Sequence, residues 1–143
     1  MEYKLTFKEY NKALKKGRLL GLKCGSCGQY TCPPKIVCQE CGSTDLEVVE
    51  LKGEGEVVTF TVSYVPAQGR ESEIPYTTVM VKLEEGPWLM GNFTGSDPNT
   101  VKVDFIGKRV KLGPRMKVLP SDAYTVGNKE AEGAFARATF VFA

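Results

Sequence analysis

Four cysteines constrain this chain more than any other feature. They form two Cys-x-x-Cys pairs, Cys24 with Cys27 and Cys38 with Cys41, and a glycine follows each pair directly. Two cysteines at this spacing on a tight turn can direct both sulfurs at one ion, and a second pair completes a tetrahedron of thiolates. The glycines let the backbone fold back so that its N–H groups face the sulfurs. The pattern predicts one metal site with these four cysteines as ligands.

The composition of the chain bears on the kind of metal site. The chain contains no histidine, so the four sulfurs fill the coordination shell and leave no open position for a substrate. We therefore expect a structural zinc ion; iron in a rubredoxin-like site, or two disulfides, are the alternatives. A segment of about twenty residues has almost no core, so the ion folds it. The fifth cysteine, Cys32, lacks a histidine base and is expected to pack as a small apolar residue.

Length and charge limit the possible classes of protein. The chain has 143 residues, of which 42% are hydrophobic and 25% charged, enough for one core and a small appendage. It shows no apolar run of membrane-spanning length and no secretory pattern at its start, so we expect a cytoplasmic protein. Residues 46–100 carry a net charge of −6, whereas residues 1–23 carry +5 and residues 101–143 carry +4.

The start of the chain predicts a helix. Thr6 and Glu9 form a capping box, and Phe7, Tyr10 and Leu14 fall on one face of a helix over residues 7–16. A helix of about ten residues is marginal alone. It must dock its aromatic face, either on its own domain or on a partner protein.

The rest of the chain predicts strands. Segments rich in β-branched and aromatic residues, with turn residues between them, cover residues 18–23, 47–51, 57–64, 76–83, 87–94, 101–105, 109–112, 116–119 and 134–143. The prediction is a mainly β protein with a helical arm (1–17), a four-cysteine zinc ribbon (18–45) and an OB-fold domain (46–143) with a five- to six-stranded antiparallel barrel. A small sandwich is the alternative.

The order of these motifs resembles the rubredoxin-like zinc-ribbon plus OB-fold family found beside thiolase-type enzymes. The resemblance runs from Tyr10 to about Val118. Two differences from the family pattern are Cys32, where an aromatic residue is expected, and Lys35, where an arginine is expected. The motifs that carry the resemblance are Gly17-Arg18-Leu19-Leu20, the two cysteine pairs, Pro33-Pro34, Gly53-x-Gly55-x-Val57, Leu83-Glu84-Glu85-Gly86 and Ile106-Gly107-Lys108-Arg109-Val110.

The resemblance implies a function in acyl-CoA metabolism. Family members partner thiolases and hydroxymethylglutaryl-CoA synthases in archaea, and their OB-fold domain helps to shape a shared CoA-binding site. A CoA ligand needs cations for its phosphates and a stacking surface for adenine. The residues expected to supply them are Lys102, Lys108, Arg109, Arg115 and Trp88.

The residues themselves argue against an independent enzyme. No histidine, phosphate-binding loop or serine or cysteine with a plausible base is present, and the adjacent acids Glu84 and Glu85 are expected to be solvated loop charges. We therefore expect a non-catalytic accessory protein. The alternative is a protein that binds single-stranded nucleic acid, because zinc ribbons and OB-folds often have this function. The net charge of −6 over residues 46–100 disfavours it, because that charge repels phosphates.

Overall fold

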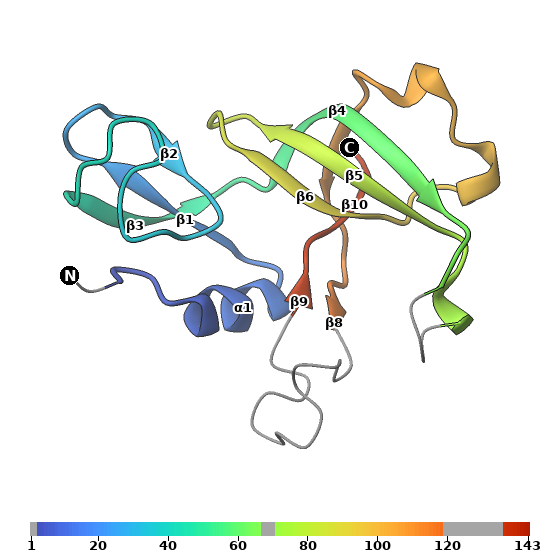
Figure 1. Ribbon diagram of the computed structural model, residues 1–143, viewed down its shortest axis with the longest axis horizontal. Coiled ribbons are helices and arrows are strands. Elements are labelled where there is room, and N and C mark those ends of the chain that lie inside the picture. Colours follow the sequence, from blue (N-terminus) through green and yellow to red (C-terminus); the bar gives the residue numbers. More distant parts are fainter. Residues whose placement is uncertain (1–2, 67–70, 119–135) are drawn as a thin grey trace.

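The chain forms a small sheet and a closed barrel, joined by a short connection (Figure 1). The computed structural model describes residues 3–66, 71–118 and 136–143. The small sheet has the strand order β2-β1-β3, and the barrel has the order β10-β6-β5-β4-β7. Strands β8 and β9 form a separate two-stranded sheet. Within the described residues, no helix is long and apolar enough to cross a membrane.

Helix α1 (Phe7–Lys15) begins at the predicted capping box. The Thr6 hydroxyl accepts a hydrogen bond from the Glu9 amide at 3.1 Å and donates one to the Glu9 carboxylate at 2.8 Å. Its buried face consists of Tyr10, Asn11, Ala13 and Leu14. Phe7 packs on Tyr10 as the sequence predicted, with ring centroids 5.6 Å apart, but it is 51% exposed and is not part of the buried set. The polar Asn11 lies there instead, because α1 packs between β1 and β9 and its amide has partners on that side.

Asn11 connects α1 to the segment at Ala136 through hydrogen bonds of its side chain. It is 2% exposed; its Nδ2 donates to the Phe7 carbonyl at 2.8 Å, and its Oδ1 accepts from the Ala136 amide at 3.0 Å. We expect Asn11→Leu to lower the free energy of unfolding by about 1–3 kcal/mol, because it leaves the half-buried Ala136 N–H without its acceptor. Urea unfolding and hydrogen exchange at Ala136 measure this. Lys12→Leu, on the exposed side of α1, is the control, with a change within about 0.5 kcal/mol.

The cysteine pairs lie at one end of the three-stranded sheet. This sheet consists of β1 (Leu19–Cys24), β2 (Tyr30–Thr31) and β3 (Leu46–Leu51). Strand β3 pairs antiparallel with β1 along its whole length, from Leu19 opposite Leu51 to Cys24 opposite Leu46. Residues 46–51, which the sequence grouped with the barrel, therefore hydrogen-bond to the ribbon's sheet. Leu22 and Cys32 lie in its core, at 0% and 2% exposed.

Five strands close the barrel. They are β4 (Glu54–Ser63), β5 (Tyr76–Leu83), β6 (Trp88–Phe93), β7 (Arg109–Leu112) and β10 (Thr139–Phe142). The predicted OB-fold barrel is confirmed, with one difference: β10 pairs antiparallel with β7 but parallel with β6. The last strand thus fills the gap between two strands that run in opposite directions. Its Phe140 is fully buried in the core with Val57, Val79, Val81 and Val110.

The stretch before β7 differs from the predicted strand over residues 101–105. It forms two 3-10 turns, η2 (Pro98–Thr100) and η3 (Val103–Phe105). Asp97 starts the first by accepting a hydrogen bond from the Asn99 amide at 2.9 Å, with Pro98 at the first helical position. The second buries Phe105 against Phe93, with ring centroids 4.6 Å apart.

Two short segments complete the described chain. A single 3-10 turn, η1 (Glu71–Glu73), precedes β5, and β8 (Lys117–Val118) pairs antiparallel with β9 (Ala136–Arg137). The predicted strand over residues 116–119 thus ends within the described part at Val118. Leu119 and residues 134–135, which belong to two predicted strands, lie outside the described residues.

Candidate functional site

The structure gathers the four predicted metal ligands at one point. The four Sγ atoms all lie within 4.8 Å of one another. Sγ of Cys24 is 3.6 Å from Sγ of Cys41, and Sγ of Cys27 is 3.6 Å from Sγ of Cys38. An ion with metal–sulfur bonds of about 2.3 Å in a tetrahedron separates its sulfurs by about 3.8 Å. The four-sulfur cluster therefore fits a tetrahedral, thiophilic ion.

Backbone amides favour the thiolate form of the first cysteine of each pair, Cys24 and Cys38, whereas the pKa values of Cys27 and Cys41 are raised by the neighbouring thiols and by burial. The amides of Ser26 and Cys27 donate to Sγ of Cys24 at 3.3 and 3.4 Å, and the amide of Glu40 donates to Sγ of Cys38 at 3.4 Å. The Cys27 amide, above all, lowers the pKa of the Cys24 thiol to about 6, and the amides of Cys41 and Glu40 lower the pKa of Cys38. A thiolate is the form that binds metal. One sulfur of each pair therefore favours the charged form that binds metal.

The two turns that hold the sulfurs have the same backbone shape. Gly28 donates to the Cys24 carbonyl and Gly42 to the Cys38 carbonyl, both at 3.0 Å. Their φ angles are +76° and +77°, in the left-handed region that favours glycine. This is the reason that a glycine follows each pair.

The fifth cysteine lies away from this cluster. Cys32 is 2% exposed, and burial raises the pKa of its thiol to about 12. A thiol with so high a pKa stays protonated and unreactive at neutral pH. It packs in the core beside Tyr10, in agreement with the apolar role expected from the sequence.

The residues predicted to bind CoA lie at separate places. Lys102 and Lys108 line one hollow of about 220 Å³, in which Ser96 and Thr100 supply hydroxyls and Phe105 part of the apolar surface. Asp104 and Phe142 complete the lining of that hollow. The structure thus brings two of the five predicted contacts together. The other three do not line this hollow.

Those three have different surroundings. Arg109 is engaged in an ion pair with Glu84, Arg115 is exposed in the turn after β7, and Trp88 lines another hollow. The sequence grouped all five by charge and ring type. It carried no signal for which of them share a cavity.

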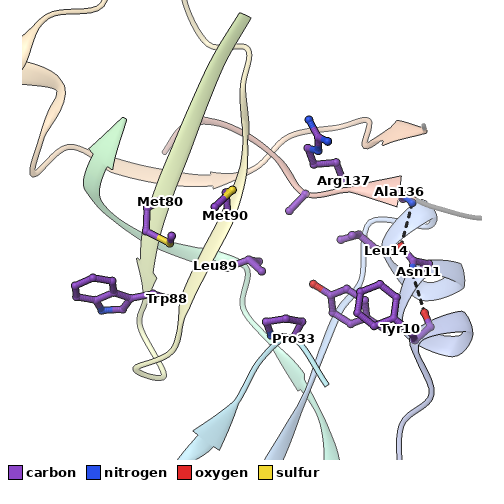
Figure 2. Close-up of a pocket in the computed structure, with 12 residues that line it drawn as sticks. Tyr10, Asn11, Leu14, Pro33, Met80, Trp88, Leu89, Met90, Ala136 and Arg137 are labelled. Atoms are coloured by element: carbon purple, nitrogen blue, oxygen red, sulfur yellow. Dashed lines mark hydrogen bonds between the residues drawn. The ribbon is translucent and has the colours of Figure 1, made fainter. Parts of the chain in front are cut away.

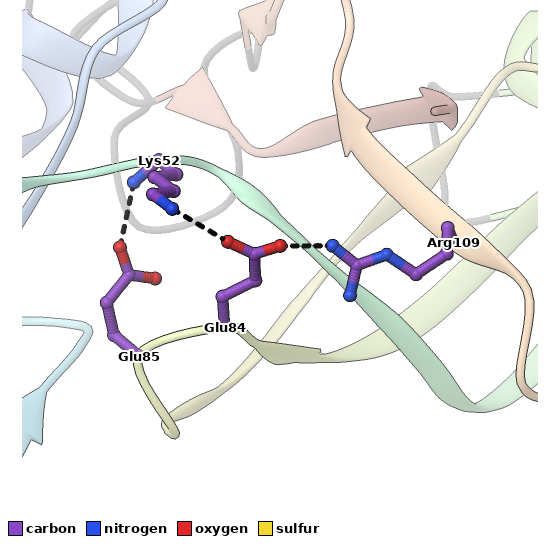
Figure 3. Close-up of polar contacts among 4 residues, drawn as sticks. All are labelled: Lys52, Glu84, Glu85 and Arg109. Atoms are coloured by element: carbon purple, nitrogen blue, oxygen red, sulfur yellow. Dashed lines mark hydrogen bonds and ion pairs between the residues drawn. The ribbon is translucent and has the colours of Figure 1, made fainter.

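Glu84 lies exposed in the turn, as the sequence suggested, and Glu85 is half-buried, but both carboxylates have partners. The two residues form the tip of the β5–β6 hairpin and hold the connection between the two parts of the chain (Figure 3). Glu85 Oε2 accepts from the Lys52 amide at 2.9 Å, and Glu84 Oε2 lies 3.3 Å from Lys52 Nζ while its other oxygen pairs with Arg109. The hairpin tip thus contacts residue 52, between β3 and β4. The sequence missed this contact because the residues are more than 25 positions apart.

The Glu84 carboxylate should titrate below its usual range. Arg109 and then Lys52 lower the pKa of Glu84, so its ion pairs persist above the unfolded pKa and are lost as the pH falls through the folded one. We expect Arg109→Gln to raise this pKa, as measured by NMR titration of the carboxyl carbon. Lys111→Gln, an exposed cation on the same strand, should leave it unchanged. An unaltered titration in Arg109→Gln would contradict the pairing.

An open apolar hollow of about 400 Å³ lies between α1 and the β5–β6 hairpin (Figure 2). We call it the helix–hairpin groove. Leu89 points across it toward Tyr10 and Leu14, Met90 lies on the other side of β6, and Pro33 of the ribbon lies at the edge of the groove. The residues that line it are Phe7, Tyr10, Asn11, Leu14, Pro33, Met80, Trp88, Leu89, Met90, Ala136, Arg137 and Ala138.

Comparison with known proteins identifies the two parts of the chain. Residues 12–47 match the model of the ChsH2 rubredoxin-like zinc ribbon domain, and residues 48–114 match that of the ChsH2 C-terminal OB-fold domain. A DUF35 domain-containing scaffold protein of Pyrococcus furiosus is 33% identical over 100 residues, which are 67% of this chain and 73% of that protein. The chain belongs to the DUF35 family. The resemblance inferred from the sequence is thereby confirmed.

Other DUF35 relatives and neighbours extend this comparison. A solved structure of an Ltp2-ChsH2(DUF35) aldolase matches with a TM-score of 0.66 and 28% identity, over 93% of this chain and 91% of the other. A probable enoyl-CoA hydratase alpha subunit of Thermomonospora curvata is 34% identical over 92 residues, 64% of this chain. The match spans only 28% of that subunit.

Proposed function

We propose that this DUF35 protein is a non-catalytic scaffold subunit of a thiolase-type or hydroxymethylglutaryl-CoA synthase-type enzyme and helps to bind CoA. The observation that carries this proposal is the match to relatives named as scaffold proteins, over most of their length. A similar solved structure and another relative support it, since the first is named an Ltp2-ChsH2(DUF35) aldolase and the second a probable enoyl-CoA hydratase alpha subunit. Both names describe proteins that consist of more than one subunit.

The metal in this proposal is zinc. Four cysteine sulfurs at tetrahedral spacing, with no histidine in the chain, suit a closed structural site for zinc. When bound, the ion supplies folding free energy and no reaction chemistry. Iron binds the same set of ligands, but its site is coloured, so the absorption spectrum of the purified protein distinguishes the two.

The CoA contacts in this proposal centre on Lys102 and Lys108. Both lysines are exposed and line the same hollow, where the hydroxyl of Ser96 can donate to phosphate oxygens. The Thr100 hydroxyl already donates to the Asp97 carbonyl at 2.7 Å. Arg115 lies on the same basic stretch of the sequence. Arg109 contributes little positive charge to the CoA phosphates, because its guanidinium is paired with the Glu84 carboxylate. The contact of Trp88 with CoA stays a prediction of the sequence.

Two measurements test this function. Purification of the protein from the cells that naturally make it, followed by mass spectrometry, should recover an acyl-CoA enzyme in a fixed ratio. Isothermal titration of that complex with CoA should show about tenfold weaker binding for the double variant Lys102→Ala/Lys108→Ala, equivalent to about 1.4 kcal/mol. Lys35→Ala, an exposed lysine of the ribbon, is the control. Recovery of ribosomal or polymerase subunits instead would overturn the proposal.

The nucleic-acid alternative has its own test. A fluorescence anisotropy titration with a single-stranded oligonucleotide at low salt should show no binding at micromolar protein. Binding that weakens steeply with added salt would favour that alternative, because it would report phosphate contacts and counterion release.

A further inference from the structure

The helix–hairpin groove exposes large apolar side chains from separate elements. Phe7 of α1 is 51% exposed, and Trp88 and Met90 of β6 are 55% and 58% exposed. Exposed single hydrophobic residues are ordinary, but several gathered around one hollow mark an interaction site. Trp, Met, Phe, Tyr and Arg are also the types that protein interfaces favour, and all five line this groove.

The outward face of the barrel extends this surface. Along β5 and β6, the inward side chains alternate with outward ones, and Met80 stands opposite Met90 in register. An antiparallel sheet that faces water normally carries polar residues at such positions. A second hollow, of about 260 Å³, continues from these two methionines across Thr59, Phe60 and Thr78 on β4 and β5. The apolar surface therefore runs from α1 across three strands.

Among the residues that line the groove, the charged one is a cation, and further cations lie next to lining residues in the sequence or in the strand register. Arg137 lines it and donates through Nη1 to Asn92 Oδ1 at 3.3 Å. Lys82 is the register partner of Trp88, and Lys8 follows Phe7 on the exposed part of α1. Glu56 is the register partner of Lys82 on the other side, so the net charge of these four side chains is +2. An occupant with acidic residues beside its apolar ones complements this arrangement.

We propose that the helix–hairpin groove docks an amphipathic helix of the partner enzyme that carries acidic residues along its flanks. Large side chains at positions i, i+3 or i+4, and i+7 of such a helix would enter the hollow between α1 and the hairpin, and its carboxylates would reach Arg137 and Lys82. The flexible thioethers of Met80 and Met90 adapt their shape to such side chains. This inference rests on the proposed scaffold function, and it specifies the surface and the chemistry of the partner.

Site-specific photocrosslinking tests the proposal directly. A benzoylphenylalanine is placed at Met90 or, as the control, at Val103, which is 78% exposed on the far stretch η3. In cells that naturally make the protein, the Met90 position should cross-link to a peptide of the enzyme that carries the expected pattern of apolar and acidic residues. The Val103 position should not cross-link to that peptide. A cross-link from Met90 to another copy of this chain, to nucleic acid or to lipid, or none, would overturn the proposal.

Substitutions measure the contribution of the groove to binding. Met90→Lys places a charge in the groove at an exposed position, and we expect it to weaken the purified complex at least tenfold in surface plasmon resonance. Val103→Lys is the matched control and should change binding less than twofold. Arg137→Glu should weaken binding most at low salt, because it repels the acidic flank.

These outcomes separate the docking proposal from the scaffold function. If the enzyme is recovered with the protein but Met90→Lys binds it as tightly as the unsubstituted chain does, the groove is not the docking site and the scaffold function stands. If no acyl-CoA enzyme is recovered at all, the scaffold function itself fails. Circular dichroism of each variant checks that its fold is retained.

Discussion

Removal of the metal is expected to unfold the ribbon and leave the barrel folded. The four sulfurs come together from two turns at the end of a sheet of only three strands, so without an ion the charges of the thiolates repel one another. Structural zinc in comparable peptides contributes about 10–16 kcal/mol at neutral pH. The barrel strands hydrogen-bond to one another in a closed ring, and Phe140 and Val79 inside it are fully buried. The loss of structure should therefore stop near Gly53.

Hydrogen exchange with and without a chelator measures this result. Amides of β1 and β3 should lose their protection, whereas those of β4, β5 and β6 keep theirs. Cys38→Ser should release one equivalent of metal per chain, and Cys32→Ala, which removes no ligand, should retain it. Loss of protection throughout the barrel would show that the two parts fold as one unit, held together by contacts such as those between α1 and β9.

The second large effect is expected from Phe140→Ala in the strand that closes the barrel. Phe140 is fully buried, and its strand completes the hydrogen bonding of both β6 and β7. Truncation of a buried phenylalanine to alanine costs about 3–5 kcal/mol through lost transfer free energy and the cavity that remains. A domain of this size has a total stability of about 5–15 kcal/mol, so the substitution removes at least about a fifth of it.

Urea unfolding followed by circular dichroism measures this loss. Phe142→Ala is the control, because the same ring two residues later is 44% exposed and should cost clearly less. Equal losses for the two variants would contradict the assignment of Phe140 to the core. A shift in the midpoint without a change in the slope would show that stability changed and not the unfolded state.

Local patterns in the sequence determined several elements directly. The spacing of Cys24, Cys27, Cys38 and Cys41 fixed the metal cluster, because the ligands of each pair lie on one short turn whose shape the following glycine permits. The capping box at Thr6 started α1, and the turn at residues 84–86 joined β5 and β6 as expected. The helix cap, the hairpin turn and each cysteine turn depend on residues fewer than five positions apart, so the local sequence holds their physical cause. The two cysteine pairs meet over a longer range, since Cys24 and Cys41 are 17 positions apart, and the shared ligand chemistry of four thiols is what predicted that contact.

Long-range packing decided the rest. Alternating hydrophobicity shows that one face of a strand is buried but not which strand lies beside it, so the parallel pairing of β10 with β6 could not be read from residues 134–143. The burial of Asn11 likewise depends on Ala136, which is 125 positions away. The helix–hairpin groove exists only where α1, β6 and β9 meet. Such contacts form when distant segments share a core, and nothing in the local sequence records which segments those are.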